Sequence, residues 1–452
     1  MGLTPQQKNR SNYTRLDRLL FYTGLAVLAL AIPVVVGQIS RGVPLLGEER
    51  RVLVFTQWWQ DELAPGVLPA LIREFEAQNP GVRITLDTRP YHEVRRLLLQ
   101  DLPQKDGEDG RKEKGGTSAA AAGFPDILGL DPRWLPALAG GDMLEPVSAQ
   151  EGHVLFRTAD GEAQSAISRA WPVTFCVIPL FYRTDLLREA GFDRPPKNQA
   201  EFTAAARAVT DPSRGRYGFA LSLSPEDPLG VYRDVFPWFR SSGAALIRNG
   251  RPAFTETPAA NTLRFLNALS QEGLLAPEAF TKTSKDRLED FAAGRLAMML
   301  APAVEIRNLR AAGVPFGVTG IPGPASYIGK PAVGVAGWYA GVSRSGKYKD
   351  EARAFISFLA EKADGVALQT GMIPEANTIP ETGADFSPEQ DAIYLKISDI
   401  YAAAGTTEEY LSLPAEMVLE TILREELRLM FEEGRTPDET VRAVQKQWEA
   451  AL

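Results

Sequence analysis

The sequence predicts an α/β protein of two domains behind an N-terminal membrane-spanning helix. Three observations lead to this prediction. The chain has 452 residues, which is too long for one ordinary hydrophobic core. A strand, a helix and a second strand follow one another between Arg51 and Leu86, which indicates a parallel sheet. Before them, residues 19–40 form an uncharged and mostly apolar run.

The apolar run at 19–40 is interpreted as a membrane anchor. A helix of this length reaches about 33 Å, enough for a hydrocarbon core of about 30 Å. Four basic residues precede it between Lys8 and Arg18, so we expect the N-terminus to stay in the cytoplasm and the remainder to be exported. Residues 1–41 would then be a cytoplasmic tail and an uncleaved signal anchor. Cleavage near residues 35–37 is the alternative.

The first elements after the anchor form a βαβ unit. Residues 51–56, with apolar side chains at 52–55, are typical of a buried strand. Residues 68–77 place apolar side chains at helical spacing, and Asn79-Pro80-Gly81 ends this helix. Residues 82–86 alternate apolar and polar side chains, as a half-buried strand does.

Helices and strands alternate along the remainder of the chain. Residues 104–123 are charged and glycine-rich, so we interpret them as a flexible surface insertion. Helices are expected at 92–102, 185–190, 200–209, 258–271, 285–293, 350–362, 388–403 and 415–433. Strands are expected at 124–130, 217–223, 296–300, 315–319 and 335–342. Thr436 to Glu439 has the residues of a capping box, which predicts a last helix from there to Leu452.

Composition and motifs exclude several classes of function. The formal net charge of −8 argues against a nucleic-acid partner, which would require a basic face. One cysteine, Cys176, and two histidines, His92 and His153, allow neither an intrachain disulfide nor a zinc cluster. Dinucleotide, P-loop and GxSxG motifs are absent from the sequence. We therefore expect no cofactor, no metal and no catalytic residue.

Aromatic residues stand where a parallel sheet binds its ligands. Trp58 and Trp59 follow the first strand, and Trp134 follows the strand at 124–130, beside Asp131. Ligands of open α/β sheets bind at the carboxyl ends of the strands. Tryptophan rings pack against the C–H faces of sugars, and carboxylates accept hydrogen bonds from hydroxyls. A core position is the alternative for any single tryptophan, but an extended loop is not expected to bury both Trp58 and Trp59.

Several segments, in this order, carry a resemblance to a known family. They are Phe75–Ile84, Pro125–Leu128 with Trp134, Gly141–Pro146, Trp171–Gly191, Phe291–Met299, Ile321–Pro324 and Gly337–Ser343. Together they resemble the extracellular solute-binding proteins of ABC importers, in the large sugar-binding group that includes maltose-binding protein. The resemblance runs from about Arg51 to Leu452.

The resemblance implies the periplasmic binding protein fold: two α/β lobes, joined by hinge crossings, that close on a ligand. Lobe one would hold residues 50–170 and 316–375, and lobe two residues 175–312 and 380–452. The implied function is capture of a sugar or oligosaccharide in the periplasm, without catalysis. The implied partners are ABC permease subunits in the inner membrane.

The resemblance also adds candidate ligand-binding residues. Trp338 matches a position that faces the cleft in many relatives. Tyr232 and Trp238 lie where the second lobe often supplies stacking residues, although for Tyr232, and for Tyr410, a core position is about as well supported.

Departures from the family pattern leave the ligand open. Cys176 stands where maltose-binding protein has an acidic residue, Arg183 where asparagine is usual, and Ala301–Ala303 lacks a common aromatic. Alternatives are a binding protein for another polar solute such as glycerol phosphate, which an excess of arginine over glutamate in the cleft would favour, and a sensor. A membrane-tethered glycosidase would need two carboxylates about 5–10 Å apart.

Overall fold

The computed structural model describes the chain in several ranges, and the statements below concern these residues. They are 50–59, 63, 66–99, 124–135, 138, 143–146, 170–227, 229–362, 396–397, 399–407 and 416–452. The predicted anchor at 19–40, the predicted insertion at 104–123, His153 and Tyr410 lie outside these ranges. Within the described ranges, no helix has both the length and the apolar character of a membrane span.

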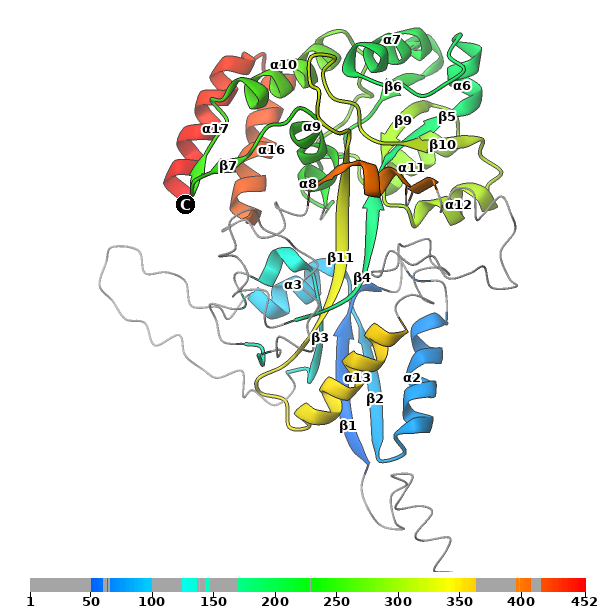
Figure 1. The fold of residues 1–452 in the computed structure, drawn as a ribbon, viewed down its shortest axis with the longest axis vertical. Coiled ribbons are helices and arrows are strands. Elements are labelled where there is room, and N and C mark those ends of the chain that lie inside the picture. Colours follow the sequence, from blue (N-terminus) through cyan, green and yellow to red (C-terminus); the bar gives the residue numbers. More distant parts are fainter. Residues whose placement is uncertain are drawn as a thin grey trace, which may run out of the picture.

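Two long antiparallel strands join an upper and a lower lobe (Figure 1). They are β4 (Trp171–Ile178) and β11 (Ala332–Val342), whose paired residues run from Gly334 opposite Ile178 to Ala340 opposite Trp171. One end of β11 pairs with β3 in the lower lobe, and the other pairs with β12 (Gly405–Thr406). This arrangement confirms the two-lobed fold with crossing strands. We call the lower part lobe one and the upper part lobe two.

Lobe one is built on the parallel strands that the sequence predicted. β1 (Arg51–Gln57) lies between β2 (Val82–Thr88) and β3 (Ile127–Leu130) and is parallel to both. Helix α2 (Val67–Gln78) forms the crossover from β1 to β2 and buries the apolar face that its spacing predicted. Helix α13 (Lys349–Glu361) returns from lobe two and packs against β4, β11 and α2.

Two short helical elements follow the carboxyl ends of the lobe-one strands. Helix α3 (Tyr91–Leu99) follows β2, and the 3₁₀ turn η2 (Pro132–Trp134) follows β3. The strand ends of a parallel sheet meet at one edge, so α3 and η2 lie at the edge that faces lobe two (Figure 1).

Lobe two is built on a four-stranded sheet of order β10-β5-β9-β6. The strands are β10 (Phe316–Thr319), β5 (Leu180–Arg183), β9 (Leu296–Leu300) and β6 (Tyr217–Phe219). A separate small hairpin comprises β7 (Ile247–Arg248) and β8 (Arg251–Pro252). Every residue of β9 is buried, as its uninterrupted apolar run indicates.

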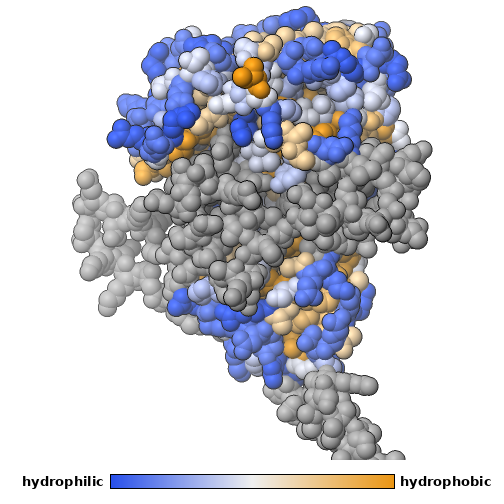
Figure 2. Space-filling model, viewed as in Figure 1, coloured by the Kyte–Doolittle hydropathy of each residue, from blue (hydrophilic) through white to orange (hydrophobic). Residues whose placement is uncertain are grey.

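The other described elements of lobe two are helical. They are α6 (Thr184–Glu189), α7 (Gln199–Val209), η3 (Pro212–Arg214), α8 (Gly230–Asp234), α9 (Phe236–Ser241), α10 (Thr257–Gln271), α11 (Ser284–Ala292), α12 (Glu305–Ala311), α16 (Glu416–Glu432) and α17 (Pro437–Ala451). The predicted capping box at the start of α17 is confirmed, because Thr436 and Glu439 bond each other's backbone N–H groups. Hydrophilic residues cover much of the visible surface of both lobes (Figure 2).

The structure differs from the sequence-based elements in several places. β10 is hydrogen-bonded to β5 in the lobe-two sheet, whereas the predicted division placed residues from 316 onward in lobe one. The strand expected at 217–223 ends at Phe219. The short helices α8, α9 and α12 were not predicted, because five to seven residues cover at most two helical turns and give a weak helical period.

Candidate functional site

The two adjacent tryptophans after β1 are both buried, at 8% exposure for Trp58 and 1% for Trp59. The expectation that one of them would be exposed was therefore wrong. The chain does not stay extended after β1, since Trp59 lies in a helical turn and its backbone N–H is bonded by the side chain of Gln57. After this turn the two rings contact each other edge to face, with centroids 6.1 Å apart, and each packs against other aromatic residues as well.

Trp59 stacks on Trp338 of β11, with ring centroids 5.1 Å apart and planes 8° from parallel. Gly129 of β3 leaves room for it, because a Cβ atom at that position would lie 3.2 Å from Cζ2 of Trp59 and 2.8 Å from Cβ of Gln57. The Trp59–Trp338 pair therefore belongs to the packed interior of lobe one, beneath the strand ends.

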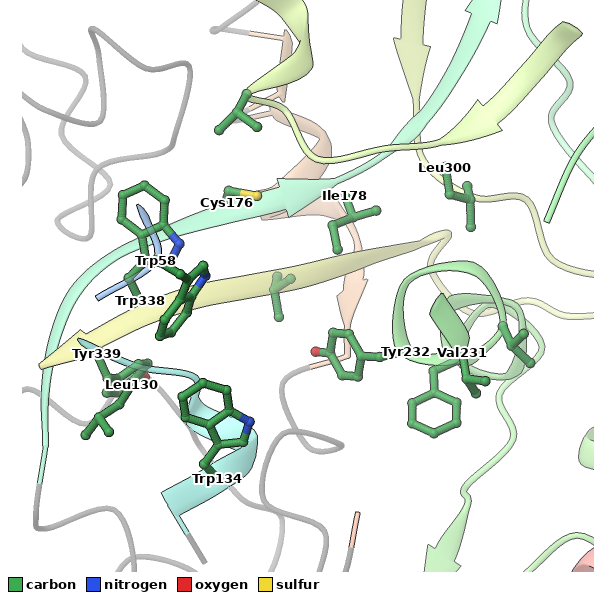
Figure 3. Close-up of a cluster of buried hydrophobic side chains, with 14 of the residues drawn as sticks. Trp58, Leu130, Trp134, Cys176, Ile178, Val231, Tyr232, Leu300, Trp338 and Tyr339 are labelled. Carbon is green, nitrogen blue, oxygen red and sulfur yellow. The ribbon is translucent and has the colours of Figure 1, made fainter. Parts of the chain in front are cut away.

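Trp58 belongs to a second aromatic group with Tyr91 and Trp134. The Trp58 ring centroid lies 5.2 Å from that of Tyr91 and 5.1 Å from that of Trp134, and Tyr91 and Trp134 are 4.9 Å apart. Trp58 comes from the loop after β1, Tyr91 from α3 and Trp134 from η2, and Figure 3 shows Trp58 and Trp134. Of the three, Tyr91 is the one that is half-exposed.

The polar part of this group is centred on Arg133. Asp131 caps η2 by accepting a hydrogen bond from the backbone N–H of Arg133, 2.9 Å away. The carboxylate of Asp131 also accepts hydrogen bonds from Nε and Nη2 of Arg133, at 2.9 and 2.7 Å. The hydroxyl of Tyr91 donates to Asp131 at 2.9 Å and accepts from Arg133 Nη2 at 2.9 Å. These bonds fix the buried guanidinium in one orientation.

Lobe two reaches the same guanidinium from the other side. Nη1 of Arg133 lies 3.4 Å from Oε1 of Glu420 on α16, and its Cζ lies 5.5 Å from the ring centre of Tyr232 on α8. The Tyr232 hydroxyl is 2.9 Å from Oγ1 of Thr407, which accepts a hydrogen bond from the backbone N–H of Val335 on β11. Arg133 is thus linked to both lobes, and Tyr232 to a crossing strand.

Trp238 lies apart from these groups. It is fully buried in lobe two, where its ring packs against Phe202, Phe219 and Phe265 at centroid distances of 5.0, 5.6 and 5.2 Å. The structure therefore does not bring Trp238 together with the other predicted site residues.

A cavity of about 570 Å³ lies between the lobes beside Arg133. Lobe one contributes Tyr91, His92, Arg95 and Arg133 to its wall, and lobe two contributes Pro225, Glu226, Asp227, Glu420, Thr421 and Arg424. None of the seven predicted site residues forms this wall. Trp58, Asp131, Trp134 and Tyr232 lie directly behind it, in contact with Tyr91 or Arg133.

The sequence analysis missed the residues of the cavity wall. Arg133 stands within the Asp131–Trp134 motif, so its position after a predicted strand could have identified it as a candidate site residue. The residues of α16 gave none, because Glu420 is 287 positions from Arg133 and only folding brings them together.

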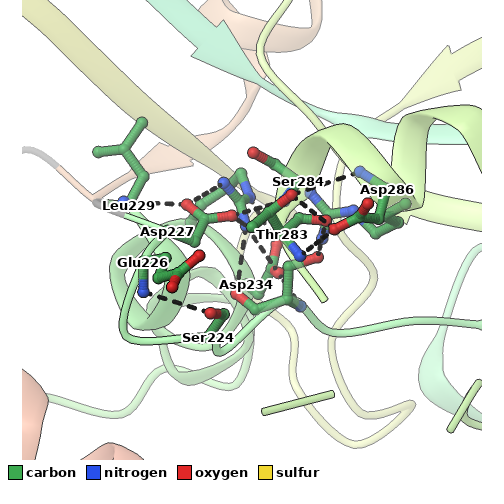
Figure 4. A network of polar contacts seen from close by, with 11 residues as sticks. Ser224, Glu226, Asp227, Leu229, Asp234, Thr283, Ser284 and Asp286 are labelled. Carbon is green, nitrogen blue, oxygen red and sulfur yellow. Dashed lines mark hydrogen bonds and ion pairs between the residues drawn. The ribbon is translucent and has the colours of Figure 1, made fainter. Parts of the chain in front are cut away.

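A buried network of charges holds the lobe-two side of the cavity. Asp227 accepts two hydrogen bonds from Arg233, at 3.0 and 2.9 Å, and one from the backbone N–H of Ser284 at 2.7 Å (Figure 4). Arg233 also donates a hydrogen bond to Asp234, and Asp234 accepts another from Arg287 at 2.6 Å. Burial favours a higher pKa for Asp227, but the charge and hydrogen bonds of Arg233 outweigh it and lower the pKa to about 2.

Among the described residues, no group of three or more His, Cys, Asp and Glu side chains is arranged to hold a metal ion. The wall of the cavity instead offers hydrogen-bonding groups of both kinds. Guanidinium groups donate and carboxylates accept, and Tyr91 adds an aromatic ring. Such a wall fits a small polar organic ligand.

Comparison with protein families and relatives gives a consistent result. The model of the family described as bacterial extracellular solute-binding protein matches residues 61–366. A protein of Brucella abortus named as a binding protein is 24% identical over 305 residues, covering 64% of this chain and 67% of the relative. A protein of Deinococcus radiodurans named as an ABC transporter-binding protein is 26% identical over 280 residues, covering 58% of this chain and 64% of the relative.

Solved structures share the fold. The GacH receptor of Streptomyces glaucescens, described unliganded and with acarbose, superposes with a TM-score of 0.69 at 18% identity, covering 90% of this chain and 99% of its own. Maltose-bound MalE3 of T. maritima superposes with a TM-score of 0.69 at 18% identity, and the match covers 89% of this chain and 100% of that protein. The sugar-binding protein MalE of Xanthomonas citri superposes with a TM-score of 0.67 at 19% identity, and the match covers 88% of this chain and 97% of that protein.

Proposed function

The chain belongs to the bacterial extracellular solute-binding protein family, and from this premise we propose that it captures a sugar or oligosaccharide between its lobes and delivers it to an ABC permease. The solved structures of the same fold include proteins described with acarbose and with maltose. Delivery without chemical change of the ligand is part of the proposal.

The observation that carries the proposal is the cavity of about 570 Å³ whose wall comes from both lobes. This volume lies within the range of about 300–1,000 Å³ typical of small-molecule sites. A sugar hydroxyl donates one hydrogen bond and accepts others, so it matches a wall that presents both guanidinium and carboxylate groups. Closure of two lobes on such a ligand would be stabilised by contacts with both.

Tyr91 and Arg133 are the proposed lobe-one contacts of the ligand, with Glu420 opposite them. Trp58, Asp131, Trp134 and Tyr232 would act behind this wall, by fixing the ring of Tyr91 and the guanidinium of Arg133. A direct ligand contact by Trp59, Trp238 or Trp338 stays a prediction from the sequence.

Ion pairs at the cavity wall favour binding over hydrolysis. A glycosidase needs two carboxylates free to donate and accept protons on either side of one bond. Asp227 is held by Arg233, and Glu420 lies 3.4 Å from Arg133, so two of the three carboxylates of the wall are engaged. The third, Glu226, is exposed.

A thermal-shift screen tests the proposed function. A ligand that binds only the folded protein raises the unfolding midpoint by an amount that depends on its concentration. We expect at least one sugar of a panel of mono- and oligosaccharides to do so, and to be recovered unchanged after incubation. A panel without any shift would contradict sugar binding, and recovered hydrolysis products would contradict a non-catalytic role.

Attachment to the cytoplasmic membrane through residues 19–40 is also proposed, because these residues are uncharged and follow a basic segment. Fractionation should then recover the full-length protein with membranes and outside the cytoplasm. A free periplasmic protein whose N-terminal sequence begins near Gln38 would contradict the uncleaved anchor.

A further inference from the structure

Helix α16 carries two arginines one turn apart, and they differ in their partners. Arg428 forms ion pairs with three glutamates, at 2.8 Å from Glu425, 2.8 Å from Glu433 and 3.7 Å from Glu432. Arg424, which lines the cavity, forms no ion pair with any described residue. The two guanidinium groups therefore have different electrostatic surroundings on the same helix.

The spacing of α16 would ordinarily supply Arg424 with a partner. A glutamate four residues before an arginine is the favourable order for an ion pair within a helix, and Glu420 stands at that position. In the structure Glu420 turns instead to Arg133, with 3.4 Å between Oε1 and Nη1. The fold thus uses the intrahelical partner of Arg424 to connect the lobes, and this leaves the charge of Arg424 available to the cavity.

The surroundings of Arg424 increase the effect of this charge. Its side chain is half-buried, and its Nε is inaccessible and has no hydrogen-bond partner among the described residues. A polar N–H that has lost water without gaining a partner is unfavourable, and a partly buried charge is screened less than an exposed one. An oxyanion in the cavity would balance the partly buried charge of the guanidinium.

The carboxylates of the cavity wall do not offset this charge equally. Asp227 is saturated by Arg233 and by the backbone N–H groups of Ser284 and Leu229. Glu420 is paired with Arg133. Glu226 forms no ion pair with any described residue, but it is exposed to solvent, which screens its charge. The positive charge of Arg424 is therefore not offset by the carboxylates of the cavity wall.

We infer that the ligand is a polyhydroxylated compound with an oxyanion substituent, a carboxylate or a phosphate, and that Arg424 is the residue that selects it. This inference rests on the proposed capture of a sugar between the lobes and specifies the chemical class of that sugar. Arginine binds both carboxylate and phosphate in a bidentate manner, so the same side chain serves either substituent.

Matched ligand pairs test the inference on the wild-type protein by calorimetry. The pairs are glucose with glucuronate, galactose with galacturonate, N-acetylglucosamine with its 6-phosphate, and glycerol with glycerol 3-phosphate. For at least one pair we expect the anionic member to bind about tenfold tighter or more, since hydrogen bonds to charged groups exceed neutral ones. The pair that shows the preference identifies the substituent as carboxylate or phosphate.

Two variants assign the preference to its residue. Arg424→Gln should lose the preference for the anionic member while it keeps its affinity for the neutral one. Arg428→Gln is the matched control, because it removes the same charge from the same helix outside the cavity, and it should keep the preference. Equal binding of both members by the wild type, or an unchanged preference in Arg424→Gln, would overturn the inference and leave the proposed function standing. If neither member of any pair binds, the inference is wrong, and the screen of mono- and oligosaccharides still decides the proposed function.

Discussion

Arg133 of lobe one and Glu420 of lobe two meet across the cleft, with 3.4 Å between Nη1 and Oε1. Both side chains are almost fully buried, at 3% and 6% exposure. Because the guanidinium also lies over the ring of Tyr232, side chains of the protein itself connect lobe one to two separate helices of lobe two. Closure of the lobes is therefore stabilised in part by contacts that belong to the chain.

The first prediction concerns this contact. Glu420→Gln removes the charge that faces Arg133, so the open arrangement should become more populated. Loss of about 1.4 kcal/mol would shift the equilibrium between open and closed forms tenfold. Small-angle scattering of the protein without added sugar should then give a larger radius of gyration for Glu420→Gln than for the wild type.

Glu425→Gln is the control, since Glu425 is exposed on the same helix and pairs with Arg428 of that helix. It should leave the radius of gyration unchanged. Superimposable curves for the wild type and Glu420→Gln would show that this contact does not hold the lobes together.

The second prediction separates packing from ligand contact at Trp59. The ring is buried and stacked on Trp338, so Trp59→Ala should lower the free energy of unfolding by about 3–5 kcal/mol. Chemical denaturation measures this loss, and sugar affinity per folded molecule should stay within a few-fold of the wild type. A stable variant with greatly reduced affinity would instead support the ligand contact that the sequence predicted.

The third prediction follows from the pKa of Asp227, which is about 2 in the folded protein against an ordinary value of 3.8. A folded-state pKa below the unfolded one stabilises the protein above the unfolded value, and the contribution disappears as pH falls from about 4 to about 2. This contribution is about 2 kcal/mol. Asp227→Asn should be destabilised relative to the wild type at pH 5, and the difference should shrink as pH approaches 2.

Denaturant unfolding at both pH values measures this difference. Asp438→Asn is the control, because Asp438 is an exposed carboxylate paired with an exposed arginine, and it should change stability by less than about 0.5 kcal/mol. A stability difference for Asp227→Asn that does not vary with pH would contradict the role assigned to its ionised form.

The fourth prediction concerns the capping box of α17. Thr436 and Glu439 satisfy each other's backbone N–H groups at the start of the last helix, so Thr436→Ala should lower the free energy of unfolding by about 1 kcal/mol. Thr436→Ser keeps the hydroxyl and should restore most of the loss. Equal stabilities for the alanine and serine variants would show that the cap does not contribute.

Local patterns in the sequence predicted much of this architecture. The order β1-α2-β2, the parallel sheet, the capped helix α17 and the strand β9 depend on side-chain periods and turn residues that act within a few positions. The sequence also placed Trp58, Trp134 and Asp131 together, because the carboxyl ends of parallel strands meet at one edge. The short helices α8 and α9 escaped prediction, since their form depends on the neighbours that bury them.

Only the tertiary structure decided that these residues support the cavity from behind and that Tyr91, Arg133 and Glu420 line it. Trp59 and Trp338 are distant in the chain, yet they stack and exclude solvent from each other. Glu420 could pair with Arg424 one turn away, but it pairs with Arg133 instead. Helical spacing brings Arg424 within reach of Glu420. Whether Glu420 pairs with Arg424 or with Arg133 depends on where the fold positions lobe one and on how much water is removed from around the two charges.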